Sequence, residues 1–233
     1  MPAYTLAPTD TVIAPDGTIL YRIQYADGTR GGYLQSTANL DPTSDAQVLG
    51  DAQVSGNAWV SGNARVSGDA RVSGNAQVSG NARVSGNAQV SGNAQVSGNA
   101  WVSGDAWVYG GAQVYGNAQV SGNAWVSGNA RVSGNARVLG DAQVSGNAWV
   151  SGDARVSKPQ HCLTVGPLGS RAATLTVCRD STLSLSYATG CFFGSREAFL
   201  AAVEATHGDS PIGNVYAAAV MLADHVVPPY TQE

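Results

Sequence analysis

The sequence predicts a mainly β protein: a parallel β-helix of hexapeptide repeats, with an N-terminal cap and a small C-terminal α+β domain. Three observations predict this fold. The unit Ala-x-Val-Ser-Gly-Asn repeats nineteen times without an insertion. The stretch before the repeats contains short strand-like runs separated by turns, and the composition changes abruptly at Lys158-Pro159. The expected domains are therefore residues 1–44, 45–157 and 158–233.

The segment before the repeats is expected to cap one open end of the solenoid, since exposed sheet edges invite aggregation. Short strands are predicted at residues 12–13 and 19–23, separated by the turn Pro15-Asp16-Gly17. Leu34 and Leu40 keep the six-residue phase of the alanines. The cap is therefore expected to blend into the first coil, with both leucines at the level of the alanines.

The six-residue unit predicts a triangular coil. Ala and Val are two positions apart, so in an extended segment both point to one side, while the variable residue and Ser point to the other. Gly followed by Asn or Asp then turns the chain, because both tolerate positive φ at low cost. Three sides close a coil of 18 residues. Nineteen units make about six coils, and at roughly 4.8 Å per coil the rod is about 30 Å long.

The outward variable residue can be sorted into three faces by taking every third unit. The first face is expected to carry Gln47, Arg65, Arg83, Trp101, Gln119, Arg137 and Arg155. The second is expected to carry Gln53, Arg71, Gln89, Trp107, Trp125 and Gln143. The third is expected to carry Trp59, Gln77, Gln95, Gln113, Arg131 and Trp149. Trp107 and Trp125 are one coil apart, so their rings should stack, with Tyr109 beside Trp107.

Two interpretations of the outward residues stay open. Arg83, Trp101, Trp107 and Trp125 could form a secondary binding surface for a nucleotide or a protein. Alternatively, Gln, Arg and Trp simply form ladders with their own kind. One corner of the coil also carries several acidic residues, namely Asp51, Asp69, Asp105 and Asp141. These could attract a cation, or could merely replace Asn in the turns.

The C-terminal segment is predicted to be a β-β-β-α-α unit. Strands are expected at residues 161–166, 174–179 and 182–187. Ser195 is a suitable N-cap for a helix through about Thr206, and a second helix should run from about Asn214 to His225.

A ligand site is expected where this unit meets the end of the solenoid or a neighbouring subunit. Its proposed members are Ser170, Arg171, Arg179, Cys191, Phe192 and Ser195. Arg would pair with a phosphate or carboxylate, Phe192 would stack on a ring, and the Gly190–Ser195 loop would point backbone N–H groups at the anion. A nucleophilic pair of Cys191 with a histidine and a plain capping domain remain alternatives.

Composition and charge exclude several classes of function. The formal net charge is −4 and charged residues make up 12% of the chain. No segment is basic, so bulk nucleic-acid binding lacks its electrostatic driving force. The three cysteines lack zinc spacing, so neither a metal nor a cofactor is expected, and reduced thiols are predicted. The start of the chain has no signal-peptide pattern and no stretch is suited to crossing a membrane, which predicts a cytoplasmic protein.

The repeats resemble those of bacterial acyltransferases with left-handed hexapeptide β-helices. That resemblance implies a left-handed parallel β-helix and a homo-oligomer, with a trimer favoured. Those enzymes carry a catalytic His, often near a loop extruded from a coil. The repeats here contain neither a His nor such a loop, so no catalytic residue is expected.

The chain also resembles a family of phage and prophage proteins of poorly defined function. The matching motifs are Leu20-Tyr21-Arg22-Ile23, Gly31-Gly32-Tyr33, Asn39-Leu40, Leu163-Thr164-Val165-Gly166, Gly190-Cys191-Phe192, Gly194-Ser195, Phe199 and His207-Gly208. The resemblance implies a non-catalytic accessory protein in the cytoplasm of the host cell. By analogy with phage proteins that sequester immune signals, the expected ligand is a small anionic nucleotide-like molecule. A structural virion or fibre component and a diverged acyltransferase remain alternatives.

Overall fold

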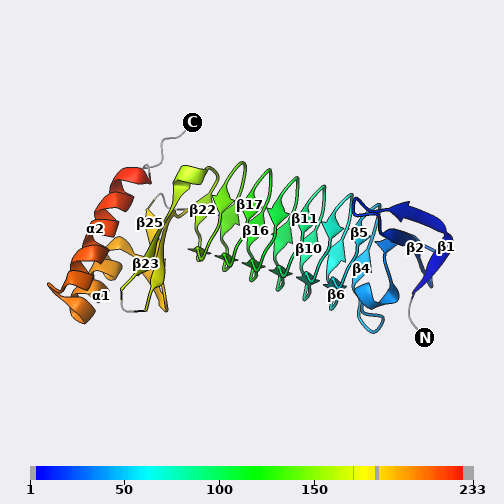
Figure 1. Cartoon of the computed structure of the whole chain (residues 1–233), viewed down its shortest axis with the longest axis horizontal. Helices are drawn as coiled ribbons and strands as arrows, with labels where there is room; N and C mark the ends of the chain where they lie inside the picture. Colours follow the sequence, from blue (N-terminus) through cyan, green and yellow to red (C-terminus); the bar gives the residue numbers. More distant parts are fainter. Residues whose placement is uncertain (1–3, 170, 182–183, 228–233) are drawn as a thin grey trace.

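A computed structural model describes residues 4–169, 171–181 and 184–227 of the chain. The protein is an elongated rod with the N-terminal hairpin at one end, the coils in the middle, and a small sheet with two helices at the other end (Figure 1). Within the described ranges, no helix combines the length and the apolar character needed to cross a bilayer.

The middle of the rod is a parallel β-solenoid of two-residue strands. The first face contains β4 (Gln47–Val48), β7 (Arg65–Val66), β10 (Arg83–Val84), β13 (Trp101–Val102), β16 (Gln119–Val120), β19 (Arg137–Val138) and β22 (Arg155–Val156). The second contains β5 (Gln53–Val54), β8 (Arg71–Val72), β11 (Gln89–Val90), β14 (Trp107–Val108), β17 (Trp125–Val126) and β20 (Gln143–Val144). The third contains β6 (Trp59–Val60), β9 (Gln77–Val78), β12 (Gln95–Val96), β15 (Gln113–Val114), β18 (Arg131–Val132) and β21 (Trp149–Val150).

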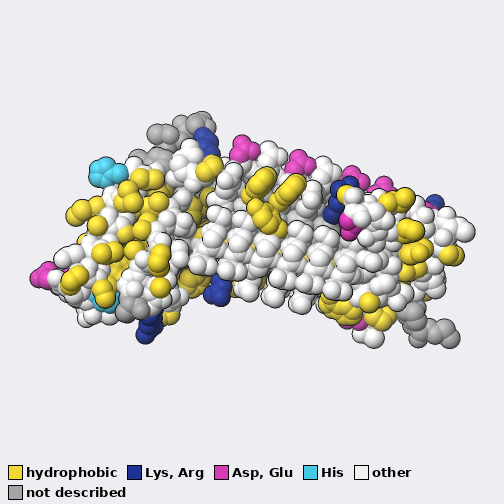
Figure 2. Space-filling model, in the orientation of Figure 1, with side chains coloured by type: hydrophobic (Ala, Val, Ile, Leu, Met, Phe, Trp, Pro, Cys, Tyr) yellow, Lys and Arg dark blue, Asp and Glu magenta, His cyan; other side chains and the backbone are white. Residues whose placement is uncertain are grey.

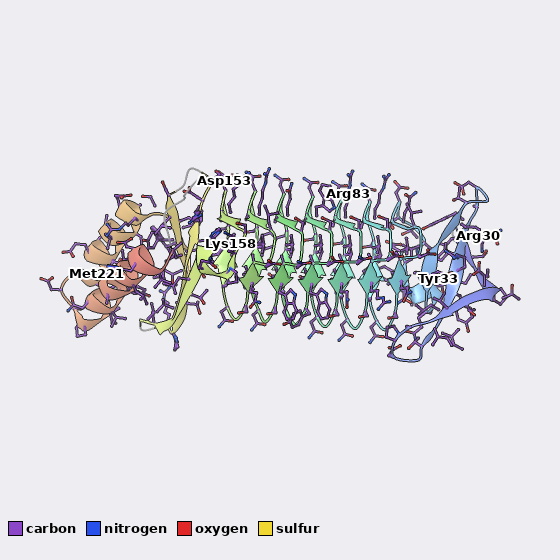
Figure 3. The ribbon with its side chains drawn as sticks, turned by 90° about the horizontal axis from the view of Figure 1, so that it is seen from above. Arg30, Tyr33, Arg83, Asp153, Lys158 and Met221 are labelled. Carbon is purple, nitrogen blue, oxygen red and sulfur yellow. A yellow bond between two sulfur atoms is a disulfide. The ribbon has the colours of Figure 1, made fainter. Side chains whose placement is uncertain are left out.

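These strands confirm the three predicted faces. Each outward residue pairs with the residue 18 positions along, as Gln89 does with Trp107. Its N–H donates to an alanine carbonyl of the next coil, typically over 2.9 Å. The repeat alanines and valines form one continuous buried core along the rod, whereas the outward side chains, Arg83 among them, project from the coils (Figure 3).

The coil corners form polar ladders. The Asn63 amide donates to Asn81, which continues through Asn99, Asn117 and Asn135 to Asp153. At the acidic corner, Asp105 accepts from Asn87 over 2.8 Å and Asp51 forms an ion pair with Arg22 of the cap over 3.2 Å. The described residues contain no group of three His, Cys, Asp or Glu side chains suited to a metal ion. Asp105 thus occupies a place in the corner ladder.

The N-terminal cap adds an antiparallel hairpin to the second face. β1 (Tyr4–Ile13) pairs with β2 (Ile19–Tyr25), β2 pairs with β3 (Arg30–Leu34), and β3 joins β5 in parallel. A single 3₁₀ turn (Thr37–Asn39) follows. The resulting sheet has nine strands, which makes the second face the longest.

The predicted level of the two cap leucines is wrong. Leu34 pairs with Val54 and Leu40 bridges to Val60, so both lie at the level of the valines. Each leucine is therefore paired with a residue 20 positions along the chain, whereas paired residues in the coils are 18 positions apart. The turn that begins at Asp41 adds the two extra residues before Ala46. Asp41 holds that turn by accepting from the Thr43 N–H over 2.9 Å.

The C-terminal unit is an antiparallel sheet of four strands, covered on one side by two helices (Figure 1). The strands are β23 (Cys162–Leu168), β24 (Ala173–Arg179), β25 (Leu185–Thr189) and β26 (Phe192–Ser195). The helices are α1 (Arg196–His207) and α2 (Pro211–Val226), and a 3₁₀ turn (Pro159–His161) leads into the sheet.

Two sequence predictions for this unit need correction. The segment expected to be an anion-binding loop is the strand β26, whose residues 192–195 pair with 186–189. The two strands are joined by a tight turn at Gly190, which has φ +55°. α2 also begins three residues earlier than expected, because Ser210 caps it by accepting from the Gly213 N–H. The predicted N-cap Ser195 is confirmed, since it accepts from the Ala198 N–H.

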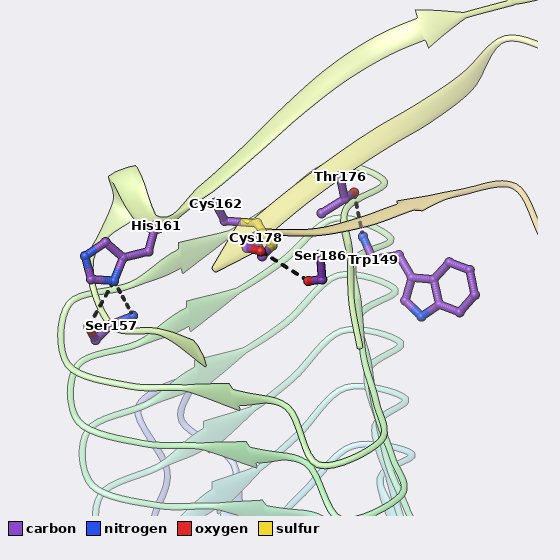
Figure 4. The surroundings of a disulfide bond; sticks show 7 residues. All are labelled: Trp149, Ser157, His161, Cys162, Thr176, Cys178 and Ser186. Atoms are coloured by element: carbon purple, nitrogen blue, oxygen red, sulfur yellow. Dashed lines mark hydrogen bonds between the residues drawn. A yellow bond between two sulfur atoms is a disulfide. The ribbon is translucent and has the colours of Figure 1, made fainter. Parts of the chain in front are cut away.

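The strand β24 closes the open end of the solenoid. Ala154 of the last coil bridges to Asp180, and the Trp149 N–H donates to the Thr176 hydroxyl over 2.9 Å (Figure 4). Cys178 belongs to the buried core of the coils. The backbone groups that a free last coil would expose are thereby partly satisfied by the C-terminal unit.

Cys162 and Cys178 lie opposite each other on β23 and β24 and form a disulfide, with an S–S distance of 2.03 Å (Figure 4). The prediction of reduced thiols is therefore wrong for this pair. The spacing of 16 residues carried no recognised signal, since the pairing depends on the register of the hairpin. Cys191 is a free, exposed cysteine.

Breaking this disulfide by Cys178→Ser should lower the free energy of unfolding by about 3 kcal/mol, because the bond closes a loop of about 15 residues. Cys191→Ser is the matched control and should leave stability nearly unchanged. Urea unfolding with and without reductant measures both effects. Thiol titration of the unreduced, denatured protein should detect only Cys191; three reactive thiols would contradict the disulfide.

Candidate functional site

A cavity of about 320 Å³ lies within the C-terminal unit, between one end of its sheet and its two helices. This volume is within the usual range of roughly 300–1,000 Å³ for small-molecule sites. The turn between β23 and β24 supplies Gly169 and Arg171, and the turn between β25 and β26 supplies Gly190 and Cys191. The remaining lining residues are Ala173, Thr189, Phe192, Phe199, Ala202, Val203, Thr206, His207 and Tyr216.

The β23–β24 turn is held tightly against α2. Gly169 has φ +65°, and a Cβ at this position would lie 2.9 Å from the Tyr216 hydroxyl. Glycine is therefore required both by the backbone conformation and by the close approach. The turn in this position brings the exposed Arg171 to the mouth of the cavity.

Aromatic rings form one wall of the cavity. The Phe199 ring packs edge-on against Phe192 and Tyr216, with centroid distances of 5.3 and 5.8 Å. The His207 imidazole stacks on Tyr216 at 5.7 Å with an interplanar angle of 23°. The cavity thus combines an apolar, ring-lined wall with a cationic arginine and a histidine at the end of α1.

An ion pair links the two helices that line the cavity. The Arg196 guanidinium at the start of α1 donates to the Asp224 carboxylate on α2 over 2.7 and 3.0 Å. The Tyr187 hydroxyl donates to the same carboxylate over 3.4 Å. Burial raises the pKa of Tyr187 to about 12, and the neighbouring Asp224 charge adds to this shift. Tyr187 therefore stays protonated at neutral pH and serves as a hydrogen-bond donor.

The structure brings together only part of the predicted site. Arg171, Cys191 and Phe192 line the cavity. Arg179 is buried at the opposite end of β24, and Ser195 uses its hydroxyl to cap α1. Ser170 lies outside the described residues.

This cavity lies inside the C-terminal unit, whereas the ligand site was predicted where the unit meets the solenoid or a neighbouring subunit. A second hollow of about 310 Å³ does occupy that junction, between Arg131 and Trp149 of the third face and the turn at Ala172. Tyr216 and His207 were not among the predicted site residues. They come close to the β23–β24 and β25–β26 turns through the packing of the two helices, which sequence spacing does not reveal.

A family model for the YdcK β-solenoid repeat matches nine segments between residues 52 and 158. The matched segments are residues 52–67, 64–77, 76–92, 94–110, 112–128, 118–132, 125–140, 130–146 and 142–158. The chain is a β-solenoid repeat protein. The matches lie within the coils and end at the boundary of the C-terminal unit, so they describe the scaffold and leave the cavity unassigned. No curated protein matches the chain.

In this β-solenoid repeat protein, the four residues of the predicted secondary surface do not form one patch. Arg83 and Trp101 are neighbours on the first face, whereas Trp107 and Trp125 are neighbours on the second. The predicted stack of Trp107 on Trp125 is confirmed, with centroids 5.4 Å apart and an interplanar angle of 7°. Tyr109 packs edge-on against Trp125 at 6.4 Å, so it contacts this ring of the pair.

Proposed function

We propose that this β-solenoid repeat protein is a non-catalytic binding protein whose C-terminal cavity takes a small anionic, nucleotide-like ligand. The observation that carries the proposal is the convergence of Arg171 with a wall of aromatic rings in one cavity. The Arg171 guanidinium would pair with a phosphate or carboxylate. The base would pack against the rings near Phe192 and Tyr216.

The solenoid would serve as a rigid scaffold in this proposal. Trp101 on the first face is 45% exposed, and such apolar area on a flat face is suited to a subunit contact. We propose a homo-oligomer, with a trimer favoured, on a left-handed coil. The motifs that flank the repeats support a phage origin, and the sequestration of an immune signal is proposed by analogy with other phage proteins. Neither bulk nucleic acid nor a membrane is a proposed partner.

A cytoplasmic location is part of the same proposal. The Cys162–Cys178 disulfide argues against it, because stable disulfides are rare in reducing compartments. Acid quenching of intact producing cells, followed by thiol labelling of the denatured protein, discriminates between a reducing and an oxidising compartment, since denaturation exposes the buried Cys178. A labelled Cys178 places the protein in a reducing compartment, and its protection places the protein in an oxidising one.

One observation favours a second candidate function. Cys191 and His207 line the same cavity, as a nucleophile and its base would. An enzyme of this kind, unlike a binding protein, would lose turnover on Cys191→Ser while keeping its affinity for the ligand. A virion component and a diverged acyltransferase remain further alternatives, which virion proteomics and acetyl-CoA turnover assays would detect.

Arg171→Ala should weaken an anionic ligand by about 10- to 150-fold, since charge-assisted hydrogen bonds contribute about 1.5–3 kcal/mol. ADP-ribose and cyclic di-AMP are suitable probes, together with any metabolite that native mass spectrometry finds in the purified protein. Calorimetry measures the affinities. Arg65→Ala, on the first face of the solenoid, is the matched control and should bind normally. Equal affinities of wild type and Arg171→Ala would move the site elsewhere.

A further inference from the structure

We propose that the second face of the solenoid carries an additional binding site, for an uncharged oligosaccharide. The site is the groove between the N-terminal hairpin and an aromatic cluster formed by Trp107, Tyr109 and Trp125. The cap and a hydrophobic patch midway along the rod are visible from the same side of the molecule, separated by polar surface (Figure 2). This groove is distinct from the cavity in the C-terminal unit.

The groove has a volume of about 220 Å³. The turn between β1 and β2 overhangs the second face and forms one wall with Ala14, Pro15 and Asp16. The floor belongs to three successive coils and consists of Gln53, Ser55, Arg71, Val72, Ser73, Gln89 and Ser91. Enclosed ligand pockets typically exceed roughly 300 Å³, so this groove would hold one ring of a chain whose remainder lies along the open face.

The aromatic cluster lies one coil beyond the floor. Gln89 pairs directly with Trp107, and Trp107 stacks on Trp125 of the following coil. Trp107 is 39% exposed, so part of its ring stays accessible beside Gln89 at the end of the groove. A flat ring at the end of a polar floor is an arrangement that packs against the C–H face of a sugar.

Departures from the repeat concentrate at this coil. Tyr109 and Tyr115 stand where nearly every other unit has Ser, and Gly111 replaces the usual Asn or Asp between them. A ladder of like residues explains the tryptophan stack but not Tyr109, whose neighbours in the adjoining coils are Ser91 and Ser127. Stacking between coils therefore does not account for a tyrosine at this position. Its edge-on contact with Trp125 enlarges the aromatic cluster.

The polar groups of the groove fit an uncharged, polyhydroxylated ligand. Amide and hydroxyl side chains donate and accept hydrogen bonds, as sugar hydroxyls do. Arg71 and Asp16 line the same groove, so their charges balance. Asp69 and Asp105 at the adjoining corner disfavour a polyanion.

A bound peptide strand fits the floor poorly. β8 is already paired with β5 on one side and β11 on the other, so its edges are not free to add a strand. Val72 is the one apolar residue among those that form the floor, so the floor offers no side-chain pocket of the kind that gives peptide specificity.

The test uses the whole protein on an array of neutral and acidic oligosaccharides, followed by calorimetry with the best neutral glycan. Trp107→Gln and Tyr109→Ser restore residues common in other units, so both variants should fold. Each is expected to weaken binding by at least about tenfold, a loss of about 1.4 kcal/mol. Trp59→Gln makes the same change on the third face and should bind as wild type does.

Several results would overturn the proposal. One is the absence of any neutral glycan bound at about 1 mM, a dissociation constant that corresponds to weak binding. Others are binding of acidic glycans only, or equal losses in all three variants. If Trp107→Gln instead lowers the number of subunits in light scattering without altering glycan binding, the face is a contact between copies of this chain.

Discussion

Gly98→Ala is expected to destabilise the solenoid by about 2–5 kcal/mol, whereas Gly146→Ala should cost only about 1–2 kcal/mol. Both glycines turn a corner with nearly the same conformation, φ +68° at Gly98 and φ +66° at Gly146. Both variants therefore bear the cost of a left-handed alanine. They differ in what the new Cβ meets.

At Gly98 the added Cβ would lie 3.0 Å from both the nitrogen and the oxygen of Gly116 in the next coil. These are backbone atoms held by the ladder of hydrogen bonds, so they cannot move aside without separating the coils. At Gly146 no atom lies within 4 Å of the added Cβ. The pair of variants thus isolates the tight stacking of the coils from the conformational preference of glycine.

Urea unfolding followed by tryptophan fluorescence measures the two losses. The expected difference between the variants is about 1–3 kcal/mol, the usual cost of overpacking. Equal losses would show that the corner tolerates a methyl group between coils, and that positive φ alone demands the glycines.

Phe199→Ala is expected to destabilise the C-terminal unit by about 3–5 kcal/mol. Phe199 is only 2% exposed and contacts three other rings, with Tyr187 stacked on it at 5.3 Å. Removing its ring would leave a cavity beneath both helices and remove one wall of the ligand cavity. Ligand binding at that site should fail together with the fold of the unit.

The loss should be confined to the C-terminal unit, because Phe199 belongs to its core cluster and not to the core of the coils. Hydrogen exchange should show faster exchange in α1 and α2 and unchanged protection in the coils. Leu222→Ala is the matched control, since Leu222 is 46% exposed on α2, and it should change stability by less than about 0.5 kcal/mol. A loss that spreads to the coils would contradict the separation of the two cores.

The repeat explains why so much of the solenoid could be predicted from residues alone. Ala and Val recur with an unbroken period, and a shift of one residue would expose every valine. Only one register therefore buries them all, and that register fixes which outward residues are neighbours. The stack of Trp107 on Trp125 follows directly from it.

The two cap leucines lie where the six-residue period is broken, and their level was predicted wrongly. Leu34 and Leu40 match the alanines in sequence phase, but two extra residues after Leu40 place them beside Val54 and Val60. Phase is informative only while no residue is inserted, and the turn at Asp41 is stabilised by a local hydrogen bond that hydrophobic periodicity does not reveal.

The sequence by itself determined the parallel coil, its three faces, the aromatic stack and the N-cap of α1, because each depends on local chemistry or on a strict period. Tertiary structure alone decided the Cys162–Cys178 disulfide and the strand β26. It also decided that Arg171, His207 and Tyr216 line one cavity. These features join residues that are distant in an aperiodic segment. Their contacts are set by how one short sheet folds against two helices and the last coil, which no repeat dictates.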